Sequence, residues 1–107
     1  MSFVVTQRFT RPNTDISWFP LSTAGTEVTQ ELTQEWETMV IANGLCTQPT
    51  ISVDADNLER TIQHTWKDQQ SFLAWNANPV CVRFDALQNA YHEQTGITYR
   101  NTRSFAP

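Results

Sequence analysis

Residues 64–79, His-Thr-Trp-Lys-Asp-Gln-Gln-Ser-Phe-Leu-Ala-Trp-Asn-Ala-Asn-Pro, change from a strand pattern to a helix pattern within a few positions. The alternation of residue types that ends at Trp66 is typical of a strand. Asp68 is a favoured helix N-cap, and apolar residues follow it at 72, 73 and 75. Pro79 stops that helix, because the residue before a proline is disfavoured in the helical conformation. The stretch therefore predicts a strand-to-helix corner with Trp66 and Trp75 on its two sides.

The strand that leads into this corner pairs with a short strand before it. Residues 58–66 alternate, so one face carries Leu58, Arg60, Ile62, His64 and Trp66, and the other carries Glu59, Thr61, Gln63 and Thr65. Residues 50–54 also alternate, and Asp54-Ala-Asp-Asn57 between the two runs is rich in turn-forming residues. The two runs are predicted to form a β-hairpin.

The remaining chain supplies two outer strands and two further helical segments. The apolar spacing predicts a helix from Thr26, as the N-cap, to Asn43-Gly44, with Val28, Leu32, Trp36, Met39 and Val40 on one stripe. Pro79 suits the first turn of a second helix, with Asn78 as its N-cap and Gly96 as its stop. A proline-containing loop precedes the first helix, and Trp18 and Phe19 in this loop are expected to fold back on the core or to meet a partner. The other segments are a first strand at 3–10, the loop at 11–21 and a last strand at 97–105.

The predicted order is β-α-β-β-α-β, and the chain of 107 residues has the size of a single domain, 1–107. Two helices on one face of a four-stranded antiparallel sheet make an α+β, ferredoxin-like plait. The other face of this sheet is polar but rich in β-branched residues: Thr61, Gln63, Thr65, Thr98 and Thr102. Such a face can meet water or a second copy of the chain, so the pattern leaves monomer and dimer open.

Composition excludes several functional classes. The net charge is −4 and only one of the seven basic residues is lysine, with no basic run, so no nucleic-acid partner is expected. Cys46 and Cys81 lack metal-site spacing and are interpreted as free thiols in a reducing compartment. Residues 1–10 do not have the pattern of a signal peptide, and no run is apolar enough to span a membrane. The expected location is cytoplasmic, with no membrane partner.

Residues 65–75 resemble the strand-to-helix corner of the antibiotic-biosynthesis-monooxygenase-like family, the dimeric α+β barrels. In that family the corner commonly has the pattern Trp-x-Ser-x-x-x-Phe-x-x-Trp, and here Trp66, Asp68, Phe72 and Trp75 stand at these positions. Ile97-Thr-Tyr99 and Gln7-Arg8 also resemble their counterparts in the haem-degrading branch. The resemblance implies the same plait, paired as a homodimer through the sheet faces.

The haem-degrading branch uses an asparagine, a tryptophan and a histidine, which correspond here to Gln7, Trp75 and Asp85. An aspartate does not replace imidazole as a ligand of haem iron, so the resemblance disfavours haem degradation. A haem-iron ligand would have to come from His64 or His92, which lie at other positions in the chain. A binding role without metal or organic cofactor is expected instead.

The cofactor-free oxygenases of the family bind an aromatic or quinone-like substrate between sheet and helices. By resemblance, His64 would be the catalytic base, Gln7 and Asn101 would donate hydrogen bonds to an oxyanion, and Trp75 would be a wall or a donor. Each residue also has a structural interpretation. Trp66 and Trp75 suit core packing, His64 suits a hydrogen-bonded core or edge position, and Gln7 could bond to Asn101 across the sheet.

Two further sets of residues keep alternatives open. Arg60, Arg100 and Arg103 could gather an anionic ligand, or could pair with surface carboxylates. His92, near a helix end, is predicted to face solvent and to interact with the helix dipole. Two functional hypotheses follow. One is a small-molecule-binding protein or cofactor-independent monooxygenase-like enzyme, and the other is a non-catalytic dimeric accessory or interaction protein.

Overall fold

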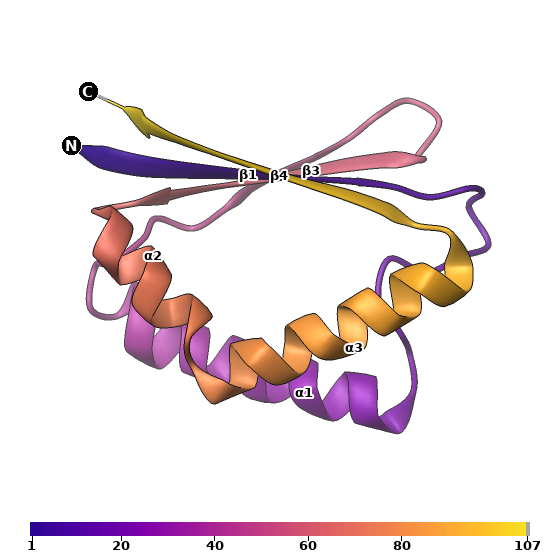
Figure 1. Cartoon of the computed structure of the whole chain (residues 1–107), viewed down its shortest axis with the longest axis horizontal. Helices are drawn as coiled ribbons and strands as arrows, with labels where there is room; N and C mark the ends of the chain where they lie inside the picture. Colours follow the sequence, from indigo (N-terminus) through magenta and orange to yellow (C-terminus); the bar gives the residue numbers. More distant parts are fainter. Residues whose placement is uncertain (107) are drawn as a thin grey trace.

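A computed structural model describes residues 1–106, and its elements follow the predicted order. They are β1 (Ser2–Thr10), α1 (Thr23–Glu35), the π-helical segment η1 (Trp36–Ile41), β2 (Thr50–Val53), β3 (Glu59–Trp66), α2 (Gln69–Asn76), α3 (Pro79–Thr95) and β4 (Thr98–Ala106). The strands make one layer and the helices make a second layer on one face of it (Figure 1). The helical region after β3 is divided at Asn78-Pro79, as predicted, into α2 and α3. These two helices meet in a V whose vertex points away from the sheet (Figure 1).

The sheet confirms the ferredoxin-like α+β prediction. Its four strands run in the order β2-β3-β1-β4, and every neighbouring pair is antiparallel. The register places Phe3 opposite Trp66, and Gln7 opposite both Ile62 and Asn101. Because residues directly opposite each other share a face, the odd positions of β1 and β4 and the even positions of β3 point toward the helices.

The strand-to-helix corner anchors the largest core cluster, which comprises Phe3, Val5, Val40, Cys46, Trp66 and Phe72. Trp66 is only 2% exposed and meets Phe72 and Trp36 edge-on, with ring centroids 5.7 and 5.6 Å apart. Edge-to-face contacts of this kind add about 0.5–1.5 kcal/mol to simple burial. Asp68 caps α2 as predicted, accepting a hydrogen bond of 2.7 Å from the Ser71 amide. Core packing of Trp66 is thereby confirmed.

The start of α1 differs from the prediction that Thr26 is its N-cap. Ser22 is the cap: its Oγ accepts from the Gly25 amide at 3.1 Å, and α1 begins at Thr23. Gly25 lies so close to the Pro20 carbonyl oxygen that a Cβ there would collide with it. The tight approach of the proline-containing loop therefore decides where the helix begins, and the apolar spacing alone does not reveal it.

A π-helical segment interrupts the apolar stripe of the first helix. In η1 the hydrogen bonds reach five residues back, as in Ala42 to Glu37, instead of four. This changes the phase of the side chains. Val40 is 1% exposed, whereas Met39, predicted on the same stripe, is 46% exposed. Trp36, the first residue of η1, points toward β3, where its ring meets His64 and Trp66.

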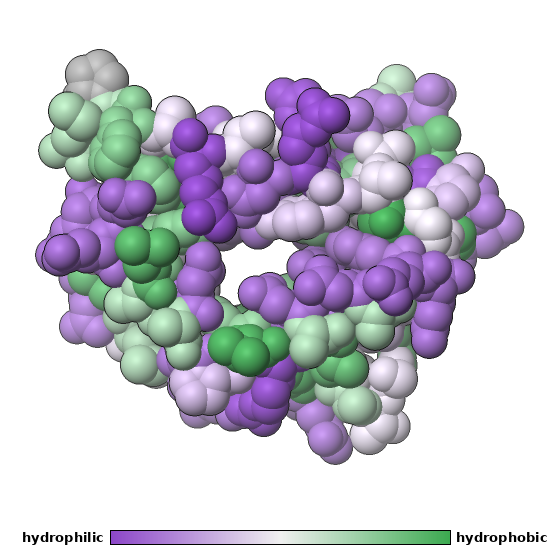
Figure 2. All heavy atoms as spheres, viewed as in Figure 1, coloured by the Kyte–Doolittle hydropathy of each residue, from purple (hydrophilic) through white to green (hydrophobic). Residues whose placement is uncertain are grey.

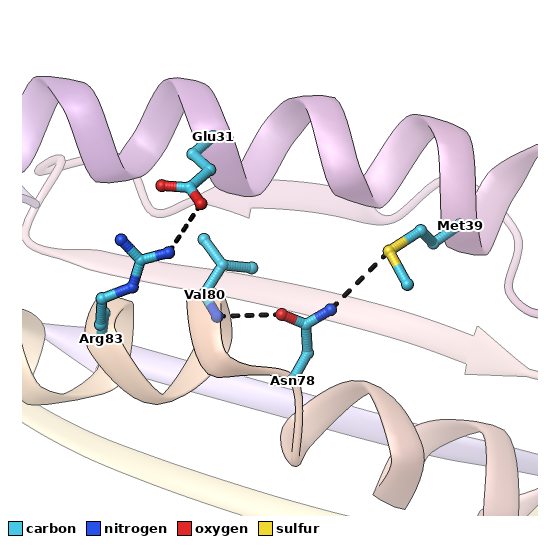
Figure 3. Close-up of polar contacts among 5 residues, drawn as sticks. All are labelled: Glu31, Met39, Asn78, Val80 and Arg83. Carbon is cyan, nitrogen blue, oxygen red and sulfur yellow. Dashed lines mark hydrogen bonds and ion pairs between the residues drawn. The ribbon is translucent and has the colours of Figure 1, made fainter.

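Polar contacts join α1 and η1 to α3 across the helix layer (Figure 3). Asn78 caps α3 as predicted by accepting from the Val80 amide at 2.9 Å, and its Nδ2 lies 3.7 Å from the Met39 sulfur. Arg83 pairs with Glu31 at 2.6 Å, but both side chains are about half exposed. Exposed pairs contribute about 0–1 kcal/mol, so the cap matters more than the ion pair.

Both cysteines are free, as predicted, and the structure shows that both are buried. Burial raises the pKa of the Cys46 thiol to about 11 and that of Cys81 to about 12, so both stay protonated and unreactive at neutral pH. None of the helices within residues 1–106 has the length and apolarity that crossing a lipid bilayer requires.

Asn78→Ala should destabilise the fold by about 0.5–2 kcal/mol, because it removes the N-cap of α3. The measurement is the free energy of unfolding in urea. Asn89→Ala is the matched control, since Asn89 is exposed in the middle of α3 and should change stability by less than about 0.5 kcal/mol. Equal losses in the two variants would contradict the assigned cap.

Candidate functional site

A hollow passes between the sheet and the helices, and Figure 2 shows it as an opening in the middle of the molecule. Its larger chamber has a volume of about 370 Å³ and mostly apolar walls, to which Leu32, Trp36, Ile51, Ile62, Trp75 and Phe84 contribute. A smaller chamber of about 160 Å³ shares Gln7, Arg60, Ile62 and Phe84 with it and adds Trp18, Phe19, Asp85 and Gln88. Ligand sites commonly have volumes of about 300–1,000 Å³ and mainly apolar linings.

The hollow exists because the apolar row of β1 is interrupted. The helix-facing residues of this strand are Phe3, Val5, Gln7 and Phe9. The first two belong to the large core cluster, and Phe9 packs against His92 and Tyr99 near the other end. Gln7, between them, faces space that no large apolar side chain fills. Two separate packed regions thus leave a chamber at the middle of the sheet.

His64 lies on the wall of the larger chamber and is half-buried. Its imidazole meets the Trp36 ring edge-on at 5.4 Å and makes no hydrogen bond to any group in residues 1–106. Burial lowers the pKa of His64 below its usual 6.5, so the ring is neutral at pH 7. A neutral imidazole with a free ring nitrogen can accept a proton from a bound ligand.

Gln7 and Asn101 face each other in register but do not bond directly. Both side-chain amides donate to the Tyr99 hydroxyl oxygen, Gln7 at 3.2 Å and Asn101 at 2.8 Å. Because that oxygen accepts two hydrogen bonds, the hydroxyl proton remains free to be donated. Gln7 lines both chambers, whereas Asn101 and Tyr99 line neither and are connected to them only through Gln7. Tyr99 was not among the predicted site residues, although its place two residues before Asn101 on a strand puts both on one face.

Trp75 lies on the chamber wall, where its ring meets Trp36 at 5.6 Å, and it is also packed against the core cluster. It therefore combines both predicted roles, a wall and a packing residue. The predicted site residues that share the larger chamber are Gln7, His64 and Trp75.

The three strand arginines do not gather. Arg100 points to the opposite face of the sheet, and Arg103 lies over the Phe72 ring with its Cζ 4.7 Å from the centroid. Arg60 alone lines the chambers, where burial lowers its pKa. Asp85 lines the smaller chamber, and burial raises the pKa of its carboxyl. Within residues 1–106 no three His, Cys, Asp or Glu side chains come together as metal ligands would.

Arg11 fixes the loop that borders the smaller chamber. It is 7% exposed, its Nε donates to the Asn57 carbonyl at 2.9 Å, and its Nη1 donates to the Ile16 carbonyl at 2.7 Å. Its guanidinium also lies 4.3 Å from the Trp18 ring centroid. The predicted folding back of the loop is confirmed by Phe19, which stacks on Phe84 with centroids 4.5 Å apart. In the sequence Arg11 marked only the end of a strand.

His92 is buried, at 8% exposure, so the prediction that it faces solvent is wrong. Its ring meets Phe9 edge-on at 5.9 Å and lies 6.3 Å from Tyr99. The Nε2 atom has no hydrogen-bond partner within residues 1–106, and burial lowers the pKa. The cause is the direction of α3, whose last turn lies against β1 and β4. His92 thus packs against the ring that carries the Tyr99 hydroxyl.

Several solved structures have the same fold as this chain. SnoaB from Streptomyces nogalater, described as a cofactor-independent oxygenase, superimposes with a TM-score of 0.64 at 13% identity over 99% of this chain and 93% of its own. Rv0793 from Mycobacterium tuberculosis gives 0.58 at 14% identity over 100% and 95%. A structure described as an antibiotic biosynthesis monooxygenase gives 0.57 at 18% identity over 100% and 99%.

The chain has the fold of the antibiotic biosynthesis monooxygenases, as its corner motif predicted. No protein-family model matches the sequence, and no curated protein matches it. At 13–18% identity the shared fold does not transfer residue roles, so the chemistry has to be argued from this chain's own side chains.

The two histidines should make the protein less stable in mild acid. The folded-state pKa of each lies below the unfolded value of 6.5, so the unfolded chain binds more protons as the pH falls. The contribution of the two histidines to the free energy of unfolding is complete above about pH 6.5 and is lost as the pH falls through the folded-state pKa. The loss is at most about 1.4 kcal/mol per pH unit for each histidine.

Urea unfolding at pH 7.5 and pH 5.5 measures this effect. The loss of stability at pH 5.5 should shrink in His64→Gln and in His92→Gln, and should shrink most in the double variant. If the double variant lost as much stability as the original chain, the histidines would not be the groups responsible.

Proposed function

We propose that this protein is a cofactor-independent, monooxygenase-like enzyme that acts on a small aromatic or quinone-like substrate bound between its sheet and its helices. The observation that carries the proposal is the chamber of about 370 Å³. Two indole rings, a neutral imidazole and an amide line this one chamber. The fold shared with SnoaB, a cofactor-independent oxygenase, supports the same class of chemistry.

The chemistry requires a substrate that forms a stabilised carbanion, such as a ring CH₂ next to a conjugated ketone. His64 takes a proton from this carbon, and the negative charge moves onto the ketone oxygen. Gln7 donates a hydrogen bond to that oxygen from its side-chain amide, which the Tyr99 hydroxyl holds in place from outside the chamber. The carbanion reduces O₂ and forms a peroxide anion on carbon, and the protonated His64 returns its proton to give the hydroperoxide. Loss of water from the peroxide leaves a new C=O, with one oxygen atom in the product and the other in water.

Tryptophan side chains suit the recognition of such a substrate. Trp36 and Trp75 border the chamber from η1 and α2, and Ile62 forms its floor on β3. Flat apolar surfaces of this kind pack on aromatic rings, and exclusion of water strengthens the hydrogen bonds to the developing oxyanion.

One observation favours the alternative of a non-catalytic binding or accessory protein. Catalytic histidines are usually held by a hydrogen bond on the second ring nitrogen, which sets the tautomer. The His64 imidazole has no such partner within residues 1–106 and is held by its contact with Trp36. Binding without turnover would need the chamber but not an oriented base.

Oxygen uptake with the anthrone dithranol tests the enzyme proposal. The protein should accelerate uptake above the buffer rate, and His64→Gln should lower kcat by about 10²-fold or more with little change in KM, because a base acts in the transition state. In the original chain kcat should rise with pH as the base loses its proton. This rise should be absent from the pH profile of His64→Gln.

Gln70→Ala is the control variant, since Gln70 is exposed on α2 and lies outside the chamber. It should keep both the rate and the pH profile. Binding of dithranol without any uptake above buffer would favour the non-catalytic alternative. An unchanged rate in His64→Gln would remove His64 from the mechanism.

We also propose that two copies associate through the face of the sheet that the helices leave open. This face carries mainly hydroxyl and amide side chains, and at its centre Gln63 donates to the Thr6 hydroxyl at 3.3 Å, with Thr102 opposite Thr6. A second copy would form hydrogen bonds with these hydroxyl and amide groups, directly or through water, in a polar interface. The family that the corner motif resembles forms homodimers through this face of the sheet, which supports the arrangement.

Light scattering after size exclusion tests the dimer and should give twice the chain mass of 12.3 kDa. Thr102→Asp should shift the protein toward the monomer, because it places a charge at the centre of the interface. Thr14→Asp, in an exposed loop, should leave the mass unchanged. A single-chain mass for the original protein at tens of micromolar would contradict the dimer.

A further inference from the structure

Arg60 occupies a position that packing alone does not explain. It points from β3 toward the helices, with Phe9 of β1 and Val53 of β2 as its register partners. Its side chain lines both chambers and also the groove beneath residues 17–21 of the loop. The guanidinium group therefore lies where the spaces around the hollow meet.

This cation has no polar partner within the described residues. The only ion pair within residues 1–106 is Arg83–Glu31 on the helix surface, so no carboxylate lies within 4.0 Å of Arg60. Arg11 and Arg103 donate hydrogen bonds to protein groups, and Arg8 and Arg100 are exposed to solvent. Arg60 is thus the one arginine in this range that is half-buried and unpaired. Burying a charge without a partner is unfavourable, and a bound anion would offset that cost.

The spacing of Arg60 and His64 specifies how a ligand would lie. They are four residues apart on one strand and point to the same face, so their Cα atoms are separated by about 13 Å. Ile62 lies between them, and Gln7 is opposite Ile62. A flat ligand that lies over Ile62 and contacts His64 with one end brings its other end to Arg60. The site therefore distinguishes a reacting end from a distal end.

Building on the proposed function, we infer that the ligand is an aromatic compound with a carboxylate at the end distal to its reacting group, and that Arg60 binds this carboxylate. The guanidinium matches a carboxylate because its N–H groups form a planar fork that makes two parallel hydrogen bonds. Asp85, which lines the smaller chamber, is not within ion-pair distance of Arg60 and leaves the fork free for the ligand.

Calorimetric titration with 6-hydroxy-2-naphthoate and with its methyl ester tests the inference. The two probes have nearly the same shape, and only the first carries a negative charge. The original chain should bind the acid at least about tenfold more tightly than the ester, since charge-assisted pairs contribute this much or more. Arg60→Met, which keeps the apolar stem, should weaken binding of the acid and abolish the preference. Arg100→Met is the matched control on the outward sheet face and should retain it.

A stability measurement separates a ligand-binding role from a structural one. Because Arg60 has no partner to lose, Arg60→Met should have a Tm equal to or above that of the original chain. A marked fall in Tm would show that the guanidinium is structural and would overturn the inference. The inference would also be overturned if Arg60→Met still preferred the acid over the ester, or if Arg100→Met lost this preference.

The same titration distinguishes failure of this inference from failure of the proposed function. If acid and ester bind equally to the original chain, the carboxylate inference falls while aromatic binding in the chamber stands. If neither binds, both fall. Catalysis is judged independently by the oxygen uptake of dithranol, which carries no carboxylate.

Discussion

The packing of Trp66 against the rings of Phe72 and Trp36 is the contact on which the architecture depends. It joins the end of β3 to Phe72 on α2 and to Trp36 on η1, and Phe3 on β1 joins the cluster through the ring of Phe72. This cluster attaches the helices to one end of the sheet. A second group, formed by Phe9, His92 and Tyr99, holds the end of α3 at the other end. With the helix layer secured at two ends, the middle is left open, and the hollow is a consequence of where the apolar residues stand along β1.

The half-buried polar groups around the hollow lower the stability of the protein when no ligand is bound. His64 is half-buried without a hydrogen bond within the described part of the chain, and Arg60 is half-buried without a carboxylate. Evolution for stability alone would favour apolar residues at both places. These costs are reasonable in a binding site, where a ligand supplies the missing partners. The Gln7 amide, by contrast, is already oriented before a ligand arrives, because it donates to the Tyr99 hydroxyl.

The solved structures and the chain's own residues support different parts of the argument. The structures share the fold over nearly the whole chain at 13–18% identity, so they account for the two layers and the order of the elements. They do not account for Arg60, Tyr99 or Arg11, whose roles follow from contacts in this protein. Asp85 stands where the haem-degrading proteins that the corner motif resembles have histidine. Its carboxyl lines the smaller chamber.

The sequence by itself determined the order of the elements, the faces of the strands, the corner, and the caps at Asp68 and Asn78. These features are local, since a period of two and a capping side chain depend only on neighbouring residues. The start of α1 at Thr23, the burial of His92 and the bridge through Tyr99 were decided only by tertiary structure. Each depends on which segment packs beside it: Pro20 against Gly25, β1 and β4 against the end of α3, and β4 against β1. The unpaired state of Arg60 belongs to the same class, because the presence of a partner depends on every element around the hollow.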